Sequence, residues 1–457
     1  MQQLLDIAPE AQNLPILVPQ GVSKVSNGKA NKLDPLDRAV HDWYRFVLSY
    51  PPHLVRQYMG EFGLGRSHVL LDPFCGTGTT LVEAKKFGIP SVGLEVSPFA
   101  HFASTAKLNW TVDGARLKRD AGVIASNVLR ELESQGIYDD AFFANNDVHA
   151  ELRGLDTELE GLILANSISE LPLHKTLVLL DALRASARKP YYGHALLALA
   201  NALVFKISNL HFGPEVGVGK PKQDVSVVAA WLNEVNKIGS DLAAMKSVSN
   251  VDSHVFNADA RCIGEFVKPN SISAVITSPP YPNEKDYTRT TRLESVLLGF
   301  VRSKEQLRQL KKGFVRSNTR GVYKDDDDDR WVVDYPEINR IANAIEARRI
   351  ELGKTSGFER MYARVTKLYF GGMARHLAEL RPLLKPGARL AYVVGDQASY
   401  LRVMIRTGEL LADIAGRLGY RLVRIDLFRT RLATASREQL REEVVVLEWP
   451  GAKGRRR

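Results

Sequence analysis

Short apolar runs that stop at a glycine, a proline or an acidic residue recur along the chain, and they predict the strands of one sheet. A continuous apolar run is typical of a strand that is covered on both faces. Helical patterns follow several of these runs, which favours an α/β fold. The runs predict seven strands, centred near residues 70, 93, 255, 275, 391, 424 and 446.

Helical periodicity is clearest directly after the first strand and in the last third of the chain. It predicts helices over Leu81–Phe87, Phe358–Leu384 and Ile405–Leu418. The last two strands, Arg421–Phe428 and Glu443–Trp449, are predicted to form a closing hairpin.

Two long segments interrupt the order of strands and are predicted to be insertions. Trp110 to Asp252 has helical periodicity and is long enough for a helical subdomain. Within it, Gly213–Gln223 is predicted to be a flexible loop, suited either to phosphate contact or to a plain connection. Val301–Gly357 forms the second insertion. The predicted order is a flexible N-terminal tail (1–38), a first core segment (39–110), the helical insertion (111–252) and a second core segment (253–300). The second insertion (301–357), a third core segment (358–450) and a basic tail (451–457) follow.

Composition excludes several broad classes. The 457 residues are 45% apolar and 25% charged, which is typical of a globular protein with one large or two moderate cores. The longest apolar run, Ala195 to Phe205, is well short of the roughly 20 residues that span a bilayer, so we expect a buried helix and no membrane segment. Cys75 and Cys262 are too isolated for a disulfide framework or a metal site, which favours a reducing, cytoplasmic compartment.

The net charge bears on which molecules the protein binds. Lysines and arginines number 62 against 52 acidic residues, a net charge of +10. A polyanionic partner accounts for this bias, although many basic proteins bind no nucleic acid. The second insertion opens with cations suited to backbone contacts along a duplex, Arg302, Lys304, Arg308, Lys311, Lys312, Arg316 and Arg320. Five aspartates follow, Asp325–Asp329; such a block favours a solvated loop, with masking of the basic face as the alternative.

A glycine-rich turn joins the first strand to the first helix. It reads Asp72-Pro73-Phe74-Cys75-Gly76-Thr77-Gly78-Thr79-Thr80. Glycines let the backbone approach a ligand, and a helix N-terminus offers unpaired N–H groups. The turn lacks the third glycine of a dinucleotide fingerprint and the Gly-Lys-Ser of a P-loop, which excludes dehydrogenases and kinases. Glu95 ends the next strand, where a nucleotide-binding sheet places an acid on ribose hydroxyls.

A second motif ends the strand that begins near Ile272. It reads Ser278-Pro279-Pro280-Tyr281. Two prolines cannot continue a ladder of hydrogen bonds, so the strand stops there. The hydroxyl of Ser278 and the neighbouring carbonyls are left at the strand tip, beside the ring of Tyr281. Acceptors next to an aromatic plate suit a planar amine, although an isolated motif of this kind is more often a plain turn.

Together, the two motifs resemble those of the S-adenosylmethionine-dependent DNA amino-methyltransferases. The cofactor loop of that family is similar to residues 72–80, and its catalytic motif has Asp, Asn or Ser before Pro-Pro and an aromatic residue. The resemblance covers roughly residues 41–110, 253–290 and 358–450. It implies the class I methyltransferase fold, a Rossmann-like seven-stranded sheet whose last strand is antiparallel.

The resemblance also implies roles for individual residues. Ser278 and Pro279 are expected to orient the amine of a flipped base, and Tyr281 to stack on that base. Both prolines, Pro279 and Pro280, hold Tyr281 rigidly beside Ser278. The cofactor S-adenosylmethionine is expected to contact Asp72, Pro73, Phe74, Gly76, Thr77, Gly78, Glu95 and Asp259, the last through the adenine amine. Residues 41–55 are expected to close over the methionine end of the cofactor, and residues 282–289 to contact the base or its phosphates; a capping helix and a surface loop are the alternatives.

The expected activity is therefore methylation of double-stranded DNA. Ser278 favours cytosine N4 as the target, because aspartate or asparagine is usual at this position in adenine N6 enzymes. Adenine N6, RNA base methylation and a catalytically silent DNA-binding subunit are the alternatives. Association with the family adds a prokaryotic restriction-modification system with a cognate restriction or defence protein. The cofactor loop precedes the catalytic motif here, unlike in many serine-type relatives, so their target-recognition boundaries do not transfer.

Overall fold

The computed structural model describes residues 33–46, 49–140, 151–213, 215–248, 250–283, 285–432 and 439–451. Most of the predicted N-terminal tail and the basic residues 453–457 lie outside these ranges. Pro35–Asp37 and Arg38–His41 (α1), some of which the tail prediction includes, form short helices. Across the described ranges, no helix is both long and apolar enough to cross a membrane.

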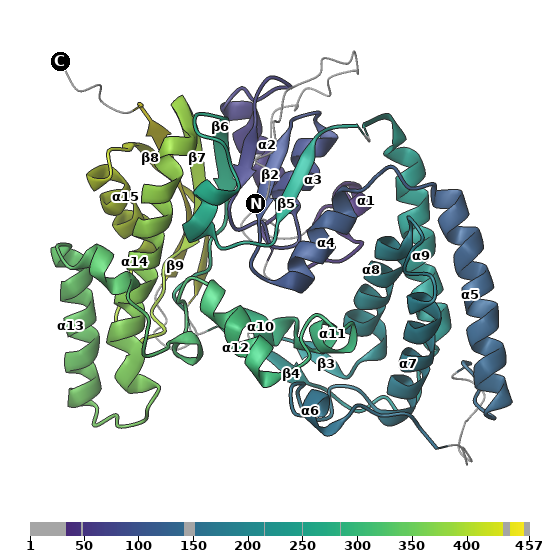
Figure 1. The fold of residues 1–457 in the computed structure, drawn as a ribbon. Coiled ribbons are helices and arrows are strands. Elements are labelled where there is room, and N and C mark those ends of the chain that lie inside the picture. Colours follow the sequence, from purple (N-terminus) through teal and green to yellow (C-terminus); the bar gives the residue numbers. More distant parts are fainter. Residues whose placement is uncertain are drawn as a thin grey trace.

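Seven strands form one sheet in the order β5-β2-β1-β6-β7-β9-β8 (Figure 1). β9 runs antiparallel to both of its neighbours, and the other pairs are parallel. The predicted seven strands and the antiparallel last strand are confirmed, and the fold is the α/β class I methyltransferase fold. The strands are β1 (Leu70–Asp72), β2 (Ser91–Leu94), β5 (Ser253–Phe256), β6 (Ile272–Thr277), β7 (Leu384–Gly395), β8 (Arg421–Leu432) and β9 (Gln439–Trp449).

Helices cover both faces of the sheet, because successive strand residues point to opposite sides. The helices α2 (Pro52–Glu61) and α3 (Thr79–Lys86) cover one face, and α14 (Tyr362–Leu380) and α15 (Thr407–Arg417) cover the other. Leu70 and Ala274 belong to the core under α2 and α3, whereas Leu71 and Val275 belong to the core under α14 and α15. Both faces of the central strands are therefore buried, as their continuous apolar sequence predicts.

The predicted helix Phe358–Leu384 is too long at both ends. A 3₁₀ turn, Glu359–Met361, precedes α14, and Leu384 already begins β7. The helix stops at Leu380 because Pro382 lies in the next turn and has no N–H to continue the ladder. The buried helix predicted at Ala195–Phe205 also ends early, since π-helical turns replace the α-helix from Leu203.

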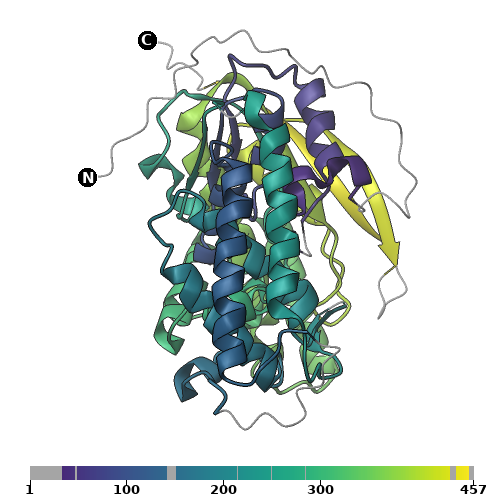
Figure 2. The same cartoon turned by 90° about the vertical axis from the view of Figure 1, so that its right-hand side faces the viewer.

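The helical insertion packs on the sheet through α4 (Pro98–Leu108), and Figure 2 shows its two longest helices side by side. A Cβ added to Gly114 would lie 2.1 Å from the carbonyl oxygen of Gly239, so these helices touch through their backbones.

The flexible loop predicted at Gly213–Gln223 is wrong for Val216–Val218 (β4), which pairs with Leu210–Phe212 (β3). The sequence did not predict this strand because glycines lie within it and beside it, and glycine is depleted in strands. The main helices are α5 (Gly114–Ser134), α7 (Glu170–Arg184), α8 (Tyr192–Ala202) and α9 (Val227–Ala244).

In Figure 1, the helices of the segment before the second insertion and the first helix of that insertion lie below the sheet, at the lower centre, whereas the last helix of the insertion lies at the left edge. The elements of this segment and of the insertion are α10 (Tyr287–Thr290), α11 (Arg292–Leu297), α12 (Lys304–Gly313), the 3₁₀ helix η6 (Asp328–Val332) and α13 (Pro336–Glu351). Both η6 and α13 pack on α14.

The solvated loop predicted for the five aspartates is wrong for two of them. Asp326 pairs with Arg316, and Asp328 pairs with Arg261; all four side chains are 10% exposed or less. A carboxylate enters the interior when a guanidinium compensates its charge. The physical reason for the error is that these partners lie outside the aspartate run, where a local charge rule does not reach.

The cations that precede the aspartates are not all available to a duplex. Lys311 pairs with Asp286 at 2.7 Å in a largely buried contact, and Lys312 pairs with Asp325 at 2.8 Å. The alternative in which the aspartates mask some of the basic face is therefore confirmed for Lys312, and also for Arg316. Backbone contacts with DNA remain a prediction for the others.

We expect Gly371→Ala, in α14, to destabilise the protein by about 1–3 kcal/mol through overpacking. A Cβ at Gly371 would lie 1.9 Å from the carbonyl oxygen of Asp328, so η6 must leave the helix. Urea unfolding measures the change in the free energy of unfolding. The matched control is Gly416→Ala on the exposed face of α15, where a Cβ meets no atom within 4 Å and a gain of about 0.5–1 kcal/mol is expected. Equal effects of the two substitutions would contradict the close packing of η6.

Candidate active site

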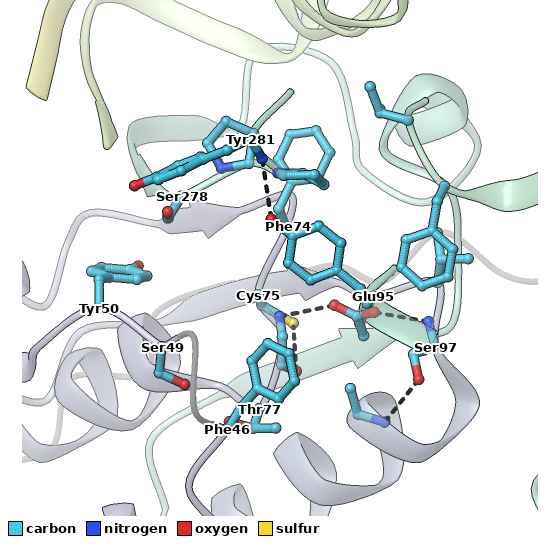
Figure 3. A pocket seen from close by; sticks show the side chains of 18 of the residues that line it. Phe46, Ser49, Tyr50, Phe74, Cys75, Thr77, Glu95, Ser97, Ser278 and Tyr281 are labelled. Atoms are coloured by element: carbon cyan, nitrogen blue, oxygen red, sulfur yellow. Dashed lines mark hydrogen bonds between the residues drawn. The ribbon is translucent and has the colours of Figure 1, made fainter. Parts of the chain in front are cut away.

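A cavity of about 300 Å³ lies at the carboxyl ends of β1, β2, β5 and β6. This edge of an open α/β sheet is where ligands bind. Figure 3 shows Ser278 and Tyr281 on one side, Glu95 and Ser97 on the other, and Phe74 between them. Ten residues predicted for the site line this one cavity, namely Pro73, Phe74, Gly76, Thr77, Glu95, Asp259, Ser278, Pro279, Pro280 and Tyr281.

Asp72 and Gly78 do not line the cavity, and their contact with a cofactor stays a prediction. Asp72 is fully buried, where it accepts hydrogen bonds from Thr277 Oγ1 at 2.6 Å and from the backbone N–H of Phe74 at 3.1 Å. Burial raises the pKa of Asp72 to about 6. Gly78 is the N-cap of α3, and its φ of 87° favours glycine. Both residues support the conformation of the glycine turn from the side away from the cavity.

Glu95 holds the glycine turn at the other wall. Its Oε2 accepts from the backbone N–H of Gly76 at 2.9 Å, and its Oε1 accepts from that of Ser97 at 2.8 Å. Burial raises the pKa of Glu95 to about 7, and the nearby charge of Asp72 adds to the shift. A Cβ added to Gly76 would meet no atom within 4 Å, so this peptide borders open space. The wall thus offers a carboxylate beside an unobstructed backbone.

Ser278 and Tyr281 form the opposite end. The hydroxyl of Ser278 donates to the carbonyl oxygen of Val393 at 3.2 Å, which ties the tip of β6 to β7. The backbone N–H of Tyr281 donates to the hydroxyl of Tyr287 at 3.1 Å. A Cβ on Gly395 would lie 3.0 Å from the ring of Tyr281, so glycine makes room for the ring. Burial raises the pKa of Tyr281, which keeps its hydroxyl protonated at neutral pH.

Both segments that the resemblance implied for ligand contact contribute residues to the lining of the cavity. Phe46, Ser49 and Tyr50 come from residues 41–55, and they line its wall near the glycine turn. From residues 282–289 come Asn283, Lys285, Tyr287 and Thr288. Which ligand group each of them contacts remains a prediction.

Sequence reasoning missed two further walls of the cavity. Gly313, Phe314 and Val315 lie at the end of α12 and just after it, and the hairpin of β8 and β9 contributes Phe428, Arg429, Arg431 and Glu442. No motif marks either group. The one signal in the sequence was the spacing of Arg429 and Arg431, which places both on one face of a strand.

The hairpin makes the end of the cavity near Ser278 cationic. Arg429 donates to Glu442, and Nη2 of Arg431 donates to Oε1 of Gln397 at 3.2 Å. Burial lowers the pKa of Lys285, and the charge of Arg431 contributes to that shift. Among the described residues at this opening, the three cations outnumber the carboxylate of Glu442, which suits an anionic ligand.

Comparisons with known proteins agree with this geometry. No family model matches the chain. The type II methyltransferase M.BsoBI of Geobacillus stearothermophilus is 25% identical over 470 residues, which cover 93% of this chain and 88% of that protein. The type II methyltransferase M.AvaI of a Nostoc species is 23% identical over 448 residues, covering 93% and 89%. M.MjaII of Methanocaldococcus jannaschii is 32% identical over 111 residues, 24% of this chain and 20% of that protein. The similarity that two motifs indicated thus extends over nearly the whole length, and the chain is similar throughout to proteins named as type II methyltransferases.

Proposed function

We propose that this protein transfers a methyl group from S-adenosylmethionine to the exocyclic amine of a flipped base in double-stranded DNA, with cytosine N4 as the favoured target. The observation that carries the proposal is that both motifs line the same cavity. The glycine turn and Glu95 form one end, and Ser278 and Tyr281 form the other. A cofactor and a base bound at these ends would meet between them.

The residues at the first end fit a sulfonium nucleoside. Phe74, Phe314 and Val315 supply apolar surface for a purine, and Glu95 supplies acceptors for ribose hydroxyls. The open space at Gly76 leaves room for the ligand beside the backbone. When bound, S-adenosylmethionine supplies an electrophilic methyl group on its sulfur.

The residues at the second end fit an amine acceptor role. The proton of the Ser278 hydroxyl is directed to the carbonyl oxygen of Val393, so the lone pairs of the hydroxyl are left to accept from an amine. The carbonyl of Pro279 is the second acceptor in this proposal. Tyr281, held by Gly395 and Tyr287, stacks on the base. Two acceptors on the amine hydrogens would aim the nitrogen lone pair at the methyl group.

The choice of DNA rests on charge and on the relatives. The net charge of +10 and the cations around the cavity suit a polyanion. The relatives carry the name of type II methyltransferases. We therefore place the protein in the modification half of a restriction-modification system in the prokaryotic cytoplasm, with a cognate restriction or defence protein as its partner.

The product of the reaction tests the proposal directly. Purified protein is incubated with tritiated S-adenosylmethionine and mixed duplex DNA, and the digested nucleosides are identified by mass spectrometry. We expect label on N4-methylcytosine. Label on N6-methyladenine would keep the enzyme and overturn the preference for cytosine. Label in RNA instead of DNA would overturn the substrate, and no transfer with intact cofactor binding would favour a silent DNA-binding subunit.

A further inference from the structure

One guanidinium connects the aspartate run to the wall of the cavity. Arg261 is 8% exposed, and its Nε lies 3.0 Å from each carboxylate oxygen of Asp259. Its Nη2 donates to Oδ2 of Asp259 at 2.7 Å. On the other side, Nη1 donates to Oδ2 of Asp328. The guanidinium of Arg261 therefore lies between two carboxylates: that of Asp259, which lines the cavity, and that of Asp328, on the side away from the cavity.

The same guanidinium also fixes the neighbouring wall. Nη2 of Arg261 donates to the carbonyl oxygens of Lys312 at 3.2 Å and Gly313 at 3.3 Å. Gly313 ends α12 and begins the wall that continues through Phe314 and Val315. Arg261 therefore joins a residue that follows β5 to a segment of the second insertion, and both border the cavity.

The position of Asp328 depends on an unusually close contact. η6 lies on α14 where two glycines follow one another, and a Cβ on Gly372 would lie 3.3 Å from Oδ2 of Asp328. Two glycines within a helix cost about 1 kcal/mol each in helix propensity, so their presence suits a position that needs the space. Arg375 of the same helix lies 3.5 Å from Oδ1 of Asp328. The carboxylate is thus buried between two arginines.

We propose that Arg261 and Asp328 are positioning residues for the adenine of the cofactor. They hold the carboxylate of Asp259 in one orientation, and they hold the Gly313–Val315 wall against the ring. Oδ1 of Asp259 also accepts from the backbone N–H of Arg261 at 2.8 Å, so the remaining acceptor site for the adenine amine is on Oδ2. This inference rests on the proposed function, because it assigns the same cavity end to S-adenosylmethionine. A planar fork with two fixed partners sets the direction of a carboxylate, which a single point charge does not do.

The test compares two probes that differ at the adenine amine. S-adenosylhomocysteine carries this amine, and S-inosylhomocysteine carries an oxygen in its place. Calorimetric titration of the full-length protein is expected to show a preference of about tenfold or more for the adenosyl probe, since the amine donates to the carboxylate of Asp259, whereas a carbonyl oxygen in its place has no proton to donate and repels the carboxylate. Asp328→Asn is expected to reduce this preference to less than about threefold, chiefly by weakening the adenosyl probe.

Two further variants make the result specific. Asp325→Asn is the matched control, because Asp325 is 68% exposed and pairs with Lys312 at the surface; its preference should equal that of the natural protein. Arg261→Lys keeps the charge and loses the fork, and a reduced preference is expected here as well. This second variant decides the question if Asp328→Asn does not fold.

Steady-state kinetics separates positioning from a general structural role. Asp328→Asn is expected to raise KM for S-adenosylmethionine about tenfold or more with kcat within about threefold. An unchanged probe preference in a folded Asp328→Asn or Arg261→Lys protein would overturn the inference while leaving the proposed function standing. A natural protein that binds neither probe would instead overturn the proposed function itself.

Discussion

Ser278→Ala is expected to lower kcat about 10²–10³-fold while the affinity for S-adenosylmethionine changes by less than about threefold. In the proposed function this hydroxyl accepts from the reacting amine, and loss of one aligned polar contact at a reacting centre has effects of this size. Cofactor binding is expected to persist because Ser278 lies at the end of the cavity opposite Glu95. Single-turnover methylation rates and calorimetric titration with the cofactor measure the two quantities separately.

Ser273→Ala is the matched control for this prediction. Ser273 lies on the same strand, where its hydroxyl accepts from the backbone N–H of Val69 at 3.3 Å, and it does not line the cavity. We expect near-natural turnover from it. Parallel loss of turnover and cofactor affinity in Ser278→Ala would show that Ser278 supports the fold of the cavity and does not orient the amine.

The contrast between Ser278 and Arg431 shows how much of the site could be predicted from the sequence. Ser278 stands in an unbroken motif at the end of a strand, so its place at the sheet edge follows from local rules alone. Arg431 reaches the same cavity from β8, whose pairing with β9 shifts register between Leu422 and Arg424 and again between Leu427 and Arg429. Each shift changes which side chains face inward, and no local pattern fixes a shift.

Asp328 shows the same limit for charged groups. Its nearest sequence neighbours are acidic, which predicts repulsion and solvation. Its partner Arg261 lies 67 residues earlier in the chain, and the contact needs glycines in a third segment. The seven strands were predictable because each strand has its own apolar run, which by itself indicates burial on both faces. Pairings between segments depend on how the segments pack.

Glu95→Gln is expected to raise the Kd for S-adenosylmethionine about 10- to 100-fold. Hydrogen bonds to a charged group contribute about 1.5–3 kcal/mol, and about 1.4 kcal/mol corresponds to a tenfold change in Kd. An amide also places an NH₂ group against the N–H of Gly76 or Ser97, where a carboxylate now accepts from both. Glu442→Gln, at the other end of the cavity, is the control and should leave this Kd within about threefold.

The pH dependence of cofactor binding distinguishes this role of Glu95 from a purely structural one. Burial raises its pKa from 4.5 to about 7, so much of the free protein carries a protonated Glu95 near neutral pH. Ribose hydroxyls donate to the carboxylate form, so cofactor binding lowers this pKa and releases a proton. The Kd should therefore rise by up to about tenfold as the pH falls from about 8 to about 6.

Glu95→Gln should remove most of this slope. The stability of the free protein should show the opposite sign. A raised pKa means that the folded chain holds more protons than the unfolded chain between pH 4.5 and about 7, so the contribution of Glu95 to stability is lost as the pH rises through this window. An unchanged pH slope of Kd in the variant would contradict the assignment of Glu95 to the ribose.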